Sequence, residues 1–506
     1  MLNFALTVKA YSLRLLLVLV SVGWVLPGHT QQDAPAVEKA LLPLLRDTTQ
    51  PAAISLPGAE MVMVPSGAQL LVASITVVGN KKTKTNIITR EIPFSPGQLY
   101  GLQALAHLFE TAQQQLMNTT LFHSVKVAAG KFDGNCVEVV VEVAERWYIF
   151  PFPYFKLIDR NFNQWLIDQK ASLKRVNYGT KLIYNNVSGR NDRIRVWLFT
   201  GYTQQVSVSY ERPYFDKKLR WGYRVFMNTA KAKEINYNTI DDKQMFWRSD
   251  NQYARQFSNF GGELTYRKKL FSRHQFGLTF FKEQVLDTIV QMNPDYFFGG
   301  LTRVQFPEFS YRFSYQKVDY IPYPLTGLAY RIRFSKGGWN KDTRVWQLHG
   351  ELFRSWQLGA DYFFSMQAYA GIKLPFTQPF FNRRFLGYGD IFLRGYEYNV
   401  IDGVAGGYLR ASLTRELAEV RFPLPEIIRR KKGLTNVPVR IFARVFANSG
   451  YVHNPLPGLN QLNNRLLHAG GIGIDLLTLY DVTFRFEYSF NQLGQNGLFL
   501  HRNISF

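Results

Sequence analysis

Most of the chain after residue 147 alternates between apolar and polar side chains with a period of two. In the stretch VRIFARVFANSG, aliphatic side chains fall on one face of a strand: Val439, Ile441, Ala443 and Val445. Arginine, phenylalanine and asparagine fall on the other: Arg440, Phe442, Arg444, Phe446 and Asn448. Because successive side chains of a strand point to opposite faces, one set can face lipid while the other faces a polar interior.

The same alternation predicts strands along residues 147–506, separated by turn residues. We count sixteen: 147–157, 171–186, 190–200, 203–212, 219–232, 254–268, 272–286, 305–318, 325–337, 343–357, 360–374, 405–422, 437–451, 464–476, 480–490 and 497–506. An even number is typical of a closed bacterial barrel with both ends in the periplasm. The predicted fold of this part is an all-β transmembrane barrel of antiparallel strands.

The lengths of the connections predict which end of the barrel faces outward. If the chain enters from the periplasm, the long connections 233–253, 287–304 and 375–404 all fall on the extracellular side. The tight connections FDKK and LFSR fall on the periplasmic side. Short periplasmic turns and longer extracellular loops are the usual arrangement.

Residues 71–146 have a different pattern, which predicts a small α+β domain. A strand, LVASITVVGN, ends at Gly79 and Asn80, and Thr83 is placed to cap a short helix that runs through Glu91. A second helix carries one apolar face, and two strands follow, LFHSVKV and CVEVVVEVAERW. In the last strand Val139 and Val141 lie on one apolar face.

The N-terminal residues indicate export from the cytoplasm. Residues 1–30 place Lys9 and Arg14 before a short apolar run, which is the order of a secretory signal and too short for a membrane-spanning helix. Residues 31–70 contain prolines at regular intervals, so we expect a linker without long helices. No later segment approaches 18 consecutive apolar residues.

Composition narrows the possible functions. A net charge of +23 would suit a nucleic-acid partner, but the basic residues are scattered and an exported chain does not meet nucleic acid. Lys and Arg also suit lipid headgroups and a polar lumen. The single Cys136 excludes an internal disulfide. The chain has none of the hydrolase, metalloprotease or phosphate-loop motifs, so we expect no enzyme, no cofactor and no metal site.

Stretches in two parts of the chain resemble a known family. VVGNKKTKTNIITREI, followed by a helix and LFHSVKV, resembles the polypeptide-transport-associated (POTRA) domain. In the barrel, FLRGYEYNVIDG, the approach FFNRRFLGYGDIFLRGY and the strand ELAEVRFPLP resemble the BamA/TamA-type outer-membrane family, the bacterial surface antigen superfamily. The resemblance covers residues 71–506 and implies one periplasmic POTRA domain before a barrel in a Gram-negative outer membrane.

The resemblance assigns a role to the sixth extracellular connection, which we call loop six (residues 375–404). It implies that Arg394, Gly395 and Tyr396 anchor this loop inside the barrel. An arginine fork can hold a carboxylate through two charge-assisted bonds. The family pattern places that carboxylate at Glu419, whereas strict alternation turns Glu416 inward, and a bulge would reconcile the two. A family aspartate after Phe446 is Asn448 here, which offers a hydrogen bond but no charge.

The resemblance implies that the protein inserts outer-membrane proteins or moves proteins across the membrane. POTRA domains in the family bind clients along a sheet edge, for which we expect Val139 and Val141. Client strands enter through a seam between the first and last barrel strands, here marked by Pro151, Pro153 and the terminal Phe506. Expected partners are outer-membrane lipids and lipopolysaccharide, unfolded client proteins and accessory periplasmic or lipoprotein subunits. The alternative is a two-partner-secretion transporter that exports one substrate through its pore.

Overall fold

The computed structural model describes residues 69–157, 176–249, 251–340, 343–423, 436–478 and 482–502, and the backbone of two short strands. These strands, β1 (Ala52–Ile54) and β2 (Val62–Val64), pair antiparallel within the predicted linker. The predicted signal segment, the rest of the linker and Phe506 lie outside the described residues. What we expect of them stays a prediction.

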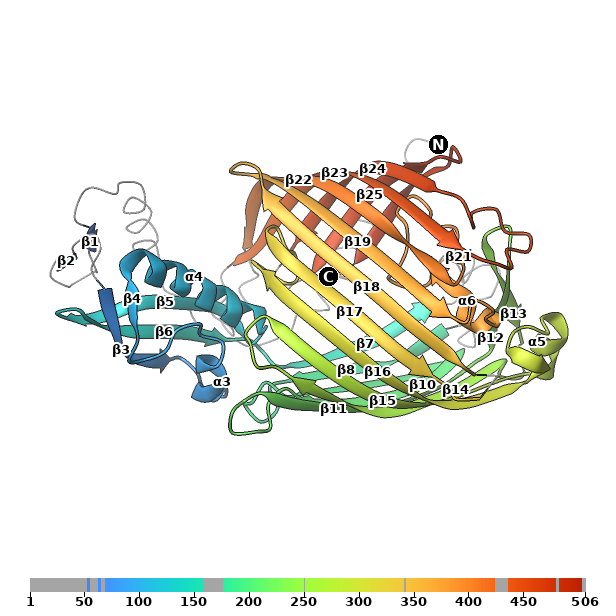
Figure 1. Ribbon diagram of the computed structural model, residues 1–506, viewed down its shortest axis with the longest axis horizontal. Coiled ribbons are helices and arrows are strands. Elements are labelled where there is room, and N and C mark those ends of the chain that lie inside the picture. The colour runs from blue at the N-terminus through green and yellow to red at the C-terminus, as the bar shows by residue number, and fades with distance from the viewer. Residues whose placement is uncertain are drawn as a thin grey trace.

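Sixteen strands form one antiparallel sheet in chain order, which confirms the predicted barrel fold (Figure 1). They are β7 (Ile149–Leu157), β8 (Val176–Asn185), β9 (Arg193–Gly201), β10 (Thr203–Arg212), β11 (Trp221–Ala232), β14 (Arg255–Tyr266), β15 (Ser272–Val285), β16 (Arg303–Val318), β17 (Gly327–Gly337), β18 (Val345–Gln357), β19 (Tyr362–Leu374), β22 (Ala405–Pro423), β23 (Asn436–His453), β24 (Leu467–Leu477), β25 (Thr483–Asn491) and β26 (Asn496–Arg502). Each overlaps one predicted strand.

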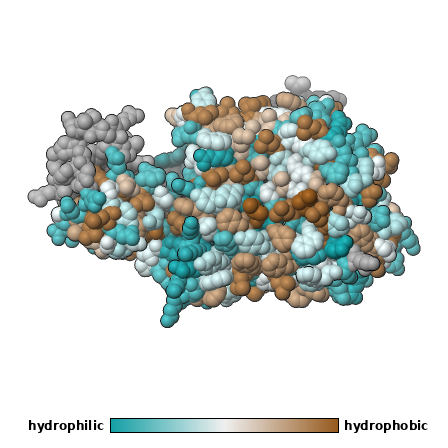
Figure 2. Space-filling view, in the orientation of Figure 1, coloured by the Kyte–Doolittle hydropathy of each residue, from teal (hydrophilic) through white to brown (hydrophobic). Residues whose placement is uncertain are grey.

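The wall of the barrel separates apolar from polar side chains as the alternation predicted. Val445 on β23 is 58% exposed, whereas its neighbours Arg444 and Phe446 are buried inside. Apolar side chains are spread over the outer wall, as Figure 2 shows for one side. In the described part of the chain, no helix has both the length and the hydrophobicity needed to cross a membrane.

The long connections gather at the end of the barrel away from the N-terminal domain (Figure 1). They contain a hairpin and several short elements: β12 (Glu234–Ile240), β13 (Lys243–Arg248), α5 (Asp287–Met292), η4 (Phe298–Gly300), α6 (Phe380–Arg383), β20 (Arg384–Leu386) and β21 (Ile401–Asp402). Asp242 at the hairpin tip accepts backbone hydrogen bonds from Gln461 and Leu462 in a neighbouring loop. The loops are therefore tied to one another over the barrel mouth.

The N-terminal domain is a four-stranded sheet covered by two helices. Its elements are β3 (Gln69–Val78), α3 (Thr85–Thr89), β4 (Leu99–Gly101), α4 (Leu102–Asn118), β5 (Phe122–Asp133) and β6 (Cys136–Glu145). The strand order is β4-β3-β6-β5, with β3 and β6 parallel. Helix α4 buries Leu105, Ala112 and Leu116 against the sheet, in keeping with its predicted apolar face.

Strand β6 lies in the middle of this sheet, so the prediction that Val139 and Val141 form a client-binding edge is wrong. Val139 pairs with Ile75 of β3 on one side and with Ala129 of β5 on the other. Both valines are fully buried. Alternation identified the buried face of this strand, but it contains no information on the order of strands in the sheet. The open edges of the sheet are β5 and the part of β3 beyond β4.

The turn after β3 also differs in part from the prediction. Gly79 has a φ of +89°, and a Cβ there would lie 2.1 Å from the Val143 carbonyl oxygen, so the turn requires glycine. Asn80 Nδ2 donates to the Thr83 carbonyl oxygen at 2.9 Å. Thr83, however, does not cap α3: the helix begins at Thr85, and no side chain caps its first turn. The Thr83 hydroxyl instead contacts the Tyr148 hydroxyl and accepts a hydrogen bond from Asn186 Nδ2.

Candidate functional site

Loop six folds back into the barrel and packs against the inside of the wall. Leu393 and Tyr396 are buried in an apolar cluster with Tyr369 and Tyr408 of the wall and Leu462 of another loop. The Tyr396 hydroxyl donates to the His468 carbonyl oxygen at 3.1 Å. The loop is therefore held by a core of its own, apart from any charge.

Gly395 lets the loop approach the wall closely. Its φ is +88°, and a Cβ at this position would lie 2.7 Å from the Cβ of Ala469 on β24. Asn491 Nδ2 donates to the Gly395 carbonyl oxygen at 2.7 Å. Any larger residue would push the loop away from β24 and weaken that bond.

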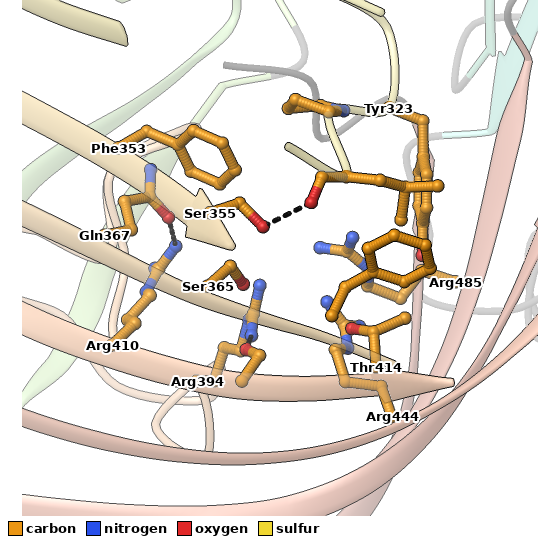
Figure 3. Close-up of a pocket in the computed structure, with 14 residues that line it drawn as sticks. Tyr323, Phe353, Ser355, Ser365, Gln367, Arg394, Arg410, Thr414, Arg444 and Arg485 are labelled. Carbon is orange, nitrogen blue, oxygen red and sulfur yellow. Dashed lines mark hydrogen bonds between the residues drawn. The ribbon is translucent and has the colours of Figure 1, made fainter. Parts of the chain in front are cut away.

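Arg394 is 5% exposed and points into a polar cavity inside the barrel, as Figure 3 shows. Its Nε lies 3.5 Å from Glu487 Oε1, and its Nη1 donates to Ser412 Oγ at 3.4 Å. Its guanidinium lies over the ring of Phe446, at 5.1 Å from the ring centre. Asn448 Nδ2 donates to the Arg394 carbonyl oxygen at 3.1 Å, so Asn448 holds the backbone of the loop rather than the charge.

The structure corrects the predicted carboxylate partner of Arg394, which is Glu487 of β25 and not Glu419. Glu419 is exposed and pairs with Arg421 at 3.0 Å. It lies seven residues along β22 from Ser412, which contacts Arg394, and seven residues of strand span about 23 Å. The expected bulge exists between Glu416 and Ala418, but Glu416 pairs with Arg440 at 2.8 Å.

A buried charge network extends from Glu487 through the next strands. Arg444 Nη2 donates to Glu487 Oε1 at 2.6 Å and to Asp475 Oδ1 at 3.1 Å. Arg485 binds Asp475 through two nitrogens, at 3.0 and 3.1 Å. The Tyr323 hydroxyl also donates to Asp475, at 2.7 Å. Both carboxylates are 0% exposed, and a buried charge is tolerated when it is paired and hydrogen-bonded in this way.

This network was not among the predictions, although the sequence contains a signal for it. In TFRFEYSF, Arg485 and Glu487 alternate with Phe484, Phe486 and Tyr488, so both charges share the inward face of a wall strand. Opposite charges two residues apart on an inward face indicate a lumen network. The family pattern directed attention to strand β22 instead.

The last strand joins the network through a histidine. His501 Nε2 on β26 lies 3.2 Å from Glu487 Oε2 and 3.5 Å from Glu397 Oε1 of loop six. These three residues are the one group among the described residues spaced closely enough to hold a metal ion. Arg394 and Arg444 already contact Glu487, however, and their positive charge disfavours a cation at this position. We therefore assign His501 to bridging the two carboxylates, which ties β26 to loop six.

The first and last strands form the two ends of the sheet. Pro151 and Pro153 of β7 pair with Leu182 and Thr180 of β8 on one side. Among the described residues no ladder joins β7 to β26, so the antiparallel pairing predicted between 147–157 and 497–506 is not formed there. Prolines within sheets are confined to edges because they lack a donor. The seam is thus the weakest junction in the described wall.

The N-terminal domain docks on the short turns of the barrel through a buried ion pair. Arg267, in the turn after β14, donates from Nη2 to Glu91 Oε2 at 2.7 Å. The Tyr214 hydroxyl of another turn donates to Glu91 Oε1 at 3.0 Å. Arg90 donates to the carbonyl oxygens of Leu219 and Arg267. Neighbouring residues of one loop in the N-terminal domain thus bind two barrel turns.

Electrostatics favours the charged form of this contact. Burial by itself would raise the pKa of Glu91, but the Arg267 guanidinium outweighs it and holds that pKa below its ordinary value. Burial and the Glu91 charge raise the pKa of the Tyr214 hydroxyl, which therefore remains a donor.

Further contacts extend the dock to other turns. The Lys84 backbone N–H donates to the Gly189 carbonyl oxygen at 2.9 Å. Asn118 at the end of α4 donates to the Val318 carbonyl oxygen and accepts from the Ile321 N–H. Four of the described short turns therefore touch the N-terminal domain.

Comparison with known proteins places this architecture in a family. A family model described as the Omp85 superfamily domain matches residues 186–476, more than half of the chain. The chain belongs to the Omp85 superfamily. A second model, described as a surface antigen variable number repeat of the POTRA family, matches residues 70–146. The predicted membership of the surface antigen superfamily is confirmed, and membership of Omp85 supports protein insertion or translocation in general.

Solved structures resemble this Omp85 protein at low identity. BamA from Haemophilus ducreyi lacking POTRA domains 1–3 has a TM-score of 0.48 at 14% identity, covering 88% of this chain and 85% of that one. CdiB from Escherichia coli has 0.44 at 13%, covering 92% and 94%. CdiB from Acinetobacter baumannii has 0.47 at 10%, covering 86% and 73%. No curated protein sequence matches the chain.

Proposed function

We propose that this Omp85 protein inserts proteins into an outer membrane by opening its barrel between β7 and β26. The observation that carries the proposal is the seam: β7 holds two prolines, and no ladder joins it to β26 among the described residues. Every other neighbouring pair of barrel strands has a continuous register of at least seven residue pairs. An opened seam exposes unpaired backbone groups that a client strand can pair with.

The network at loop six supports this opening by keeping the rest of the barrel fixed. It links loop six to β23, β24 and β25 through Arg394, Arg444 and Glu487. The last strand is attached to it through His501 and the β25 ladder, and Phe499 of β26 packs against Tyr398 of loop six. Movement at β7 therefore leaves the network intact.

The POTRA domain would receive clients along its open edges. The exposed side of β3 beyond β4 and the outer side of β5 each present backbone groups without a neighbouring strand in the sheet. Main-chain hydrogen bonds to such an edge bind extended segments of many sequences. Because the domain docks against the barrel turns, a bound client is held close to the periplasmic end of the barrel.

The setting we propose is a Gram-negative outer membrane, with the POTRA domain in the periplasm. The exposed apolar outer wall fits a lipid environment, and lipids, lipopolysaccharide and unfolded clients are the proposed partners, with accessory periplasmic or lipoprotein subunits. We further propose that the protein catalyses no reaction and needs no cofactor.

Site-specific photocrosslinking in cells tests the proposal. A photoreactive amino acid at Phe155 of β7, which is exposed to 59% on the outer face of the strand, should crosslink to outer-membrane proteins during their assembly. The same group at Val225 of β11, which is exposed to 51% on the outer wall, is the control and should crosslink to none. Crosslinks from neither site, together with client crosslinks from the lumen residue Arg195, would favour secretion through the pore instead.

A further inference from the structure

A second basic cavity inside the barrel lies apart from the Arg394 network. Its volume is about 540 Å³, and it is lined from strands β15 to β19 and capped by Ile391 of loop six. Four arginines line it: Arg273, Arg312, Arg331 and Arg333. Gln275 and Ser314 add neutral hydrogen-bonding groups between them.

The strand register arranges these side chains in two rows across the wall. One row runs from Gln275 through Arg312 and Arg333 to His349. The other, two residues further along each strand, runs from Arg273 through Ser314 and Arg331 to Glu351. Neighbouring strands lie about 4.8 Å apart, so the guanidinium groups of each row are within reach of one small ligand.

The first row places two like charges directly opposite each other. Arg312 and Arg333 are cross-strand partners, and like charges in that position destabilise a sheet. Glu308 pairs with Arg333 at 3.2 Å and so compensates the charge of Arg333. Arg312 Nη1 donates a hydrogen bond to the neutral side chain of Gln275, at 3.3 Å from its Oε1.

The carboxylates of this region do not balance the arginines. Glu351 pairs with Arg331 at 2.9 Å, and the nearby Glu263 pairs with Arg224 at 3.5 Å. Among the described residues no carboxylate lies within 4 Å of Arg273 or Arg312. Two guanidinium groups of the cavity therefore have no carboxylate at ion-pair distance among the described residues. A lumen with low-dielectric walls concentrates the field of such charges.

We propose that this cavity binds a small multivalent oxyanion of the phosphate class. Arginine forks match the oxygens of phosphate through paired donors, and arginine-lined lumens select anions and phosphate in other pores. An anion between the two rows would offset the Arg312–Arg333 repulsion and engage Arg273 at the same time. The cavity opens to the lumen and not to lipid, so the ligand is a soluble anion. The proposal does not depend on the proposed insertase function.

Isothermal titration of the full-length protein in uncharged detergent tests this, with inorganic pyrophosphate as the probe and chloride at matched ionic strength as the blank. We expect saturable binding of pyrophosphate and weaker binding of inorganic phosphate. Arg312→Gln should weaken pyrophosphate binding about tenfold or more, because a charge-assisted bond is lost. Arg195→Gln is the matched control: it removes a half-buried arginine of β9 outside the cavity and should leave binding unchanged.

Thermal melting provides a second readout that separates binding from folding. Without pyrophosphate, Arg312→Gln should melt at or above the wild-type temperature, since a like-charge contact is removed, while losing the rise that pyrophosphate gives the wild type. Arg273→Gln should lose the same rise. Three results would each overturn the proposal. The first is wild-type pyrophosphate binding by both cavity variants, and the second is an equal weakening of pyrophosphate binding by Arg195→Gln. The third is binding of a hexaglutamate peptide by a protein that does not bind pyrophosphate.

Discussion

At the scale of single residues, the interior of this barrel is organised by arginines whose roles differ with their partners. Arg394 anchors a loop through Glu487, and Arg267 anchors a domain through Glu91. Both sites are more than nine-tenths buried on each side of the pair. Removing one member leaves the other charge buried without compensation, which costs about 3–5 kcal/mol.

Arg394→Ala should leave the barrel able to fold but lower its resistance to heat in a gel-shift assay and its function in cells. Glu487→Ala should reproduce both effects, because Glu487 is the carboxylate that Arg394 reaches. Glu419→Ala is the control and should resemble the wild type, since Glu419 pairs only with the exposed Arg421 in the described contacts. If Glu419→Ala were as damaging as Arg394→Ala, the assigned partner would be wrong.

The Glu91–Arg267 contact predicts that the POTRA domain is released by acid. The pKa of Glu91 is lower in the folded protein than its ordinary value of 4.5. Its contribution to docking is therefore full above about pH 4.5 and is lost as the pH falls through the lower folded value. Hydrogen exchange of the POTRA–barrel interface should show the release.

Glu91→Gln should abolish this pH dependence and weaken the contact between the POTRA domain and the barrel at neutral pH. Glu110→Gln on α4 is the matched control, because Glu110 is exposed and pairs with His107 alone among the described residues. Exchange at the interface that stays slow in Glu91→Gln would show that the ion pair does not hold the domain.

At the scale of elements, the sequence predicts the positions of the strands, because these depend on periodicity. It does not predict the order of strands in the POTRA sheet or the strand that loop six contacts, because these depend on how the chain folds. Sixteen strands could be found because each alternates over a length that spans the membrane. The central position of β6 could not be predicted, because its parallel pairing with β3 produces no local pattern in the sequence. Glu487 was missed for a similar reason: which wall strand loop six meets depends on how far the loop descends into the lumen.

Proline substitution tests the corrected order of the POTRA sheet. Val139→Pro should cost about 1–3 kcal/mol or more, because β6 pairs on both sides and the substitution leaves a buried carbonyl group without its donor. On the edge strand β5, donors alternate between the sheet and the open side. Of Lys126→Pro and Val127→Pro, only one should therefore destabilise the domain strongly. Equal damage at both β5 positions, by hydrogen exchange across the domain, would contradict an open β5 edge.

At the scale of the whole molecule, the protein consists of one docked domain and a barrel with one weak junction. The POTRA contacts involve turns from β8 to β17, on the side of the barrel where the chain enters. The loop-six network lies on the opposite side, at β23 to β25. The seam between β7 and β26 lies between these two regions in the sheet order, and it is the one junction of barrel strands without a ladder among the described residues.

Locking the seam with a disulfide tests lateral opening most directly. In a Cys136→Ser background, paired cysteines scanned across Phe150–Phe155 and Leu498–His501 should contain a register that crosslinks on oxidation. The control is a pair at Ser207 and Asn228, which face each other on β10 and β11 within the closed wall. The account predicts that the seam crosslink abolishes client assembly, that reduction restores it, and that the control crosslink has no effect. Wild-type assembly of outer-membrane proteins by a fully crosslinked seam would contradict lateral opening and favour secretion through the pore.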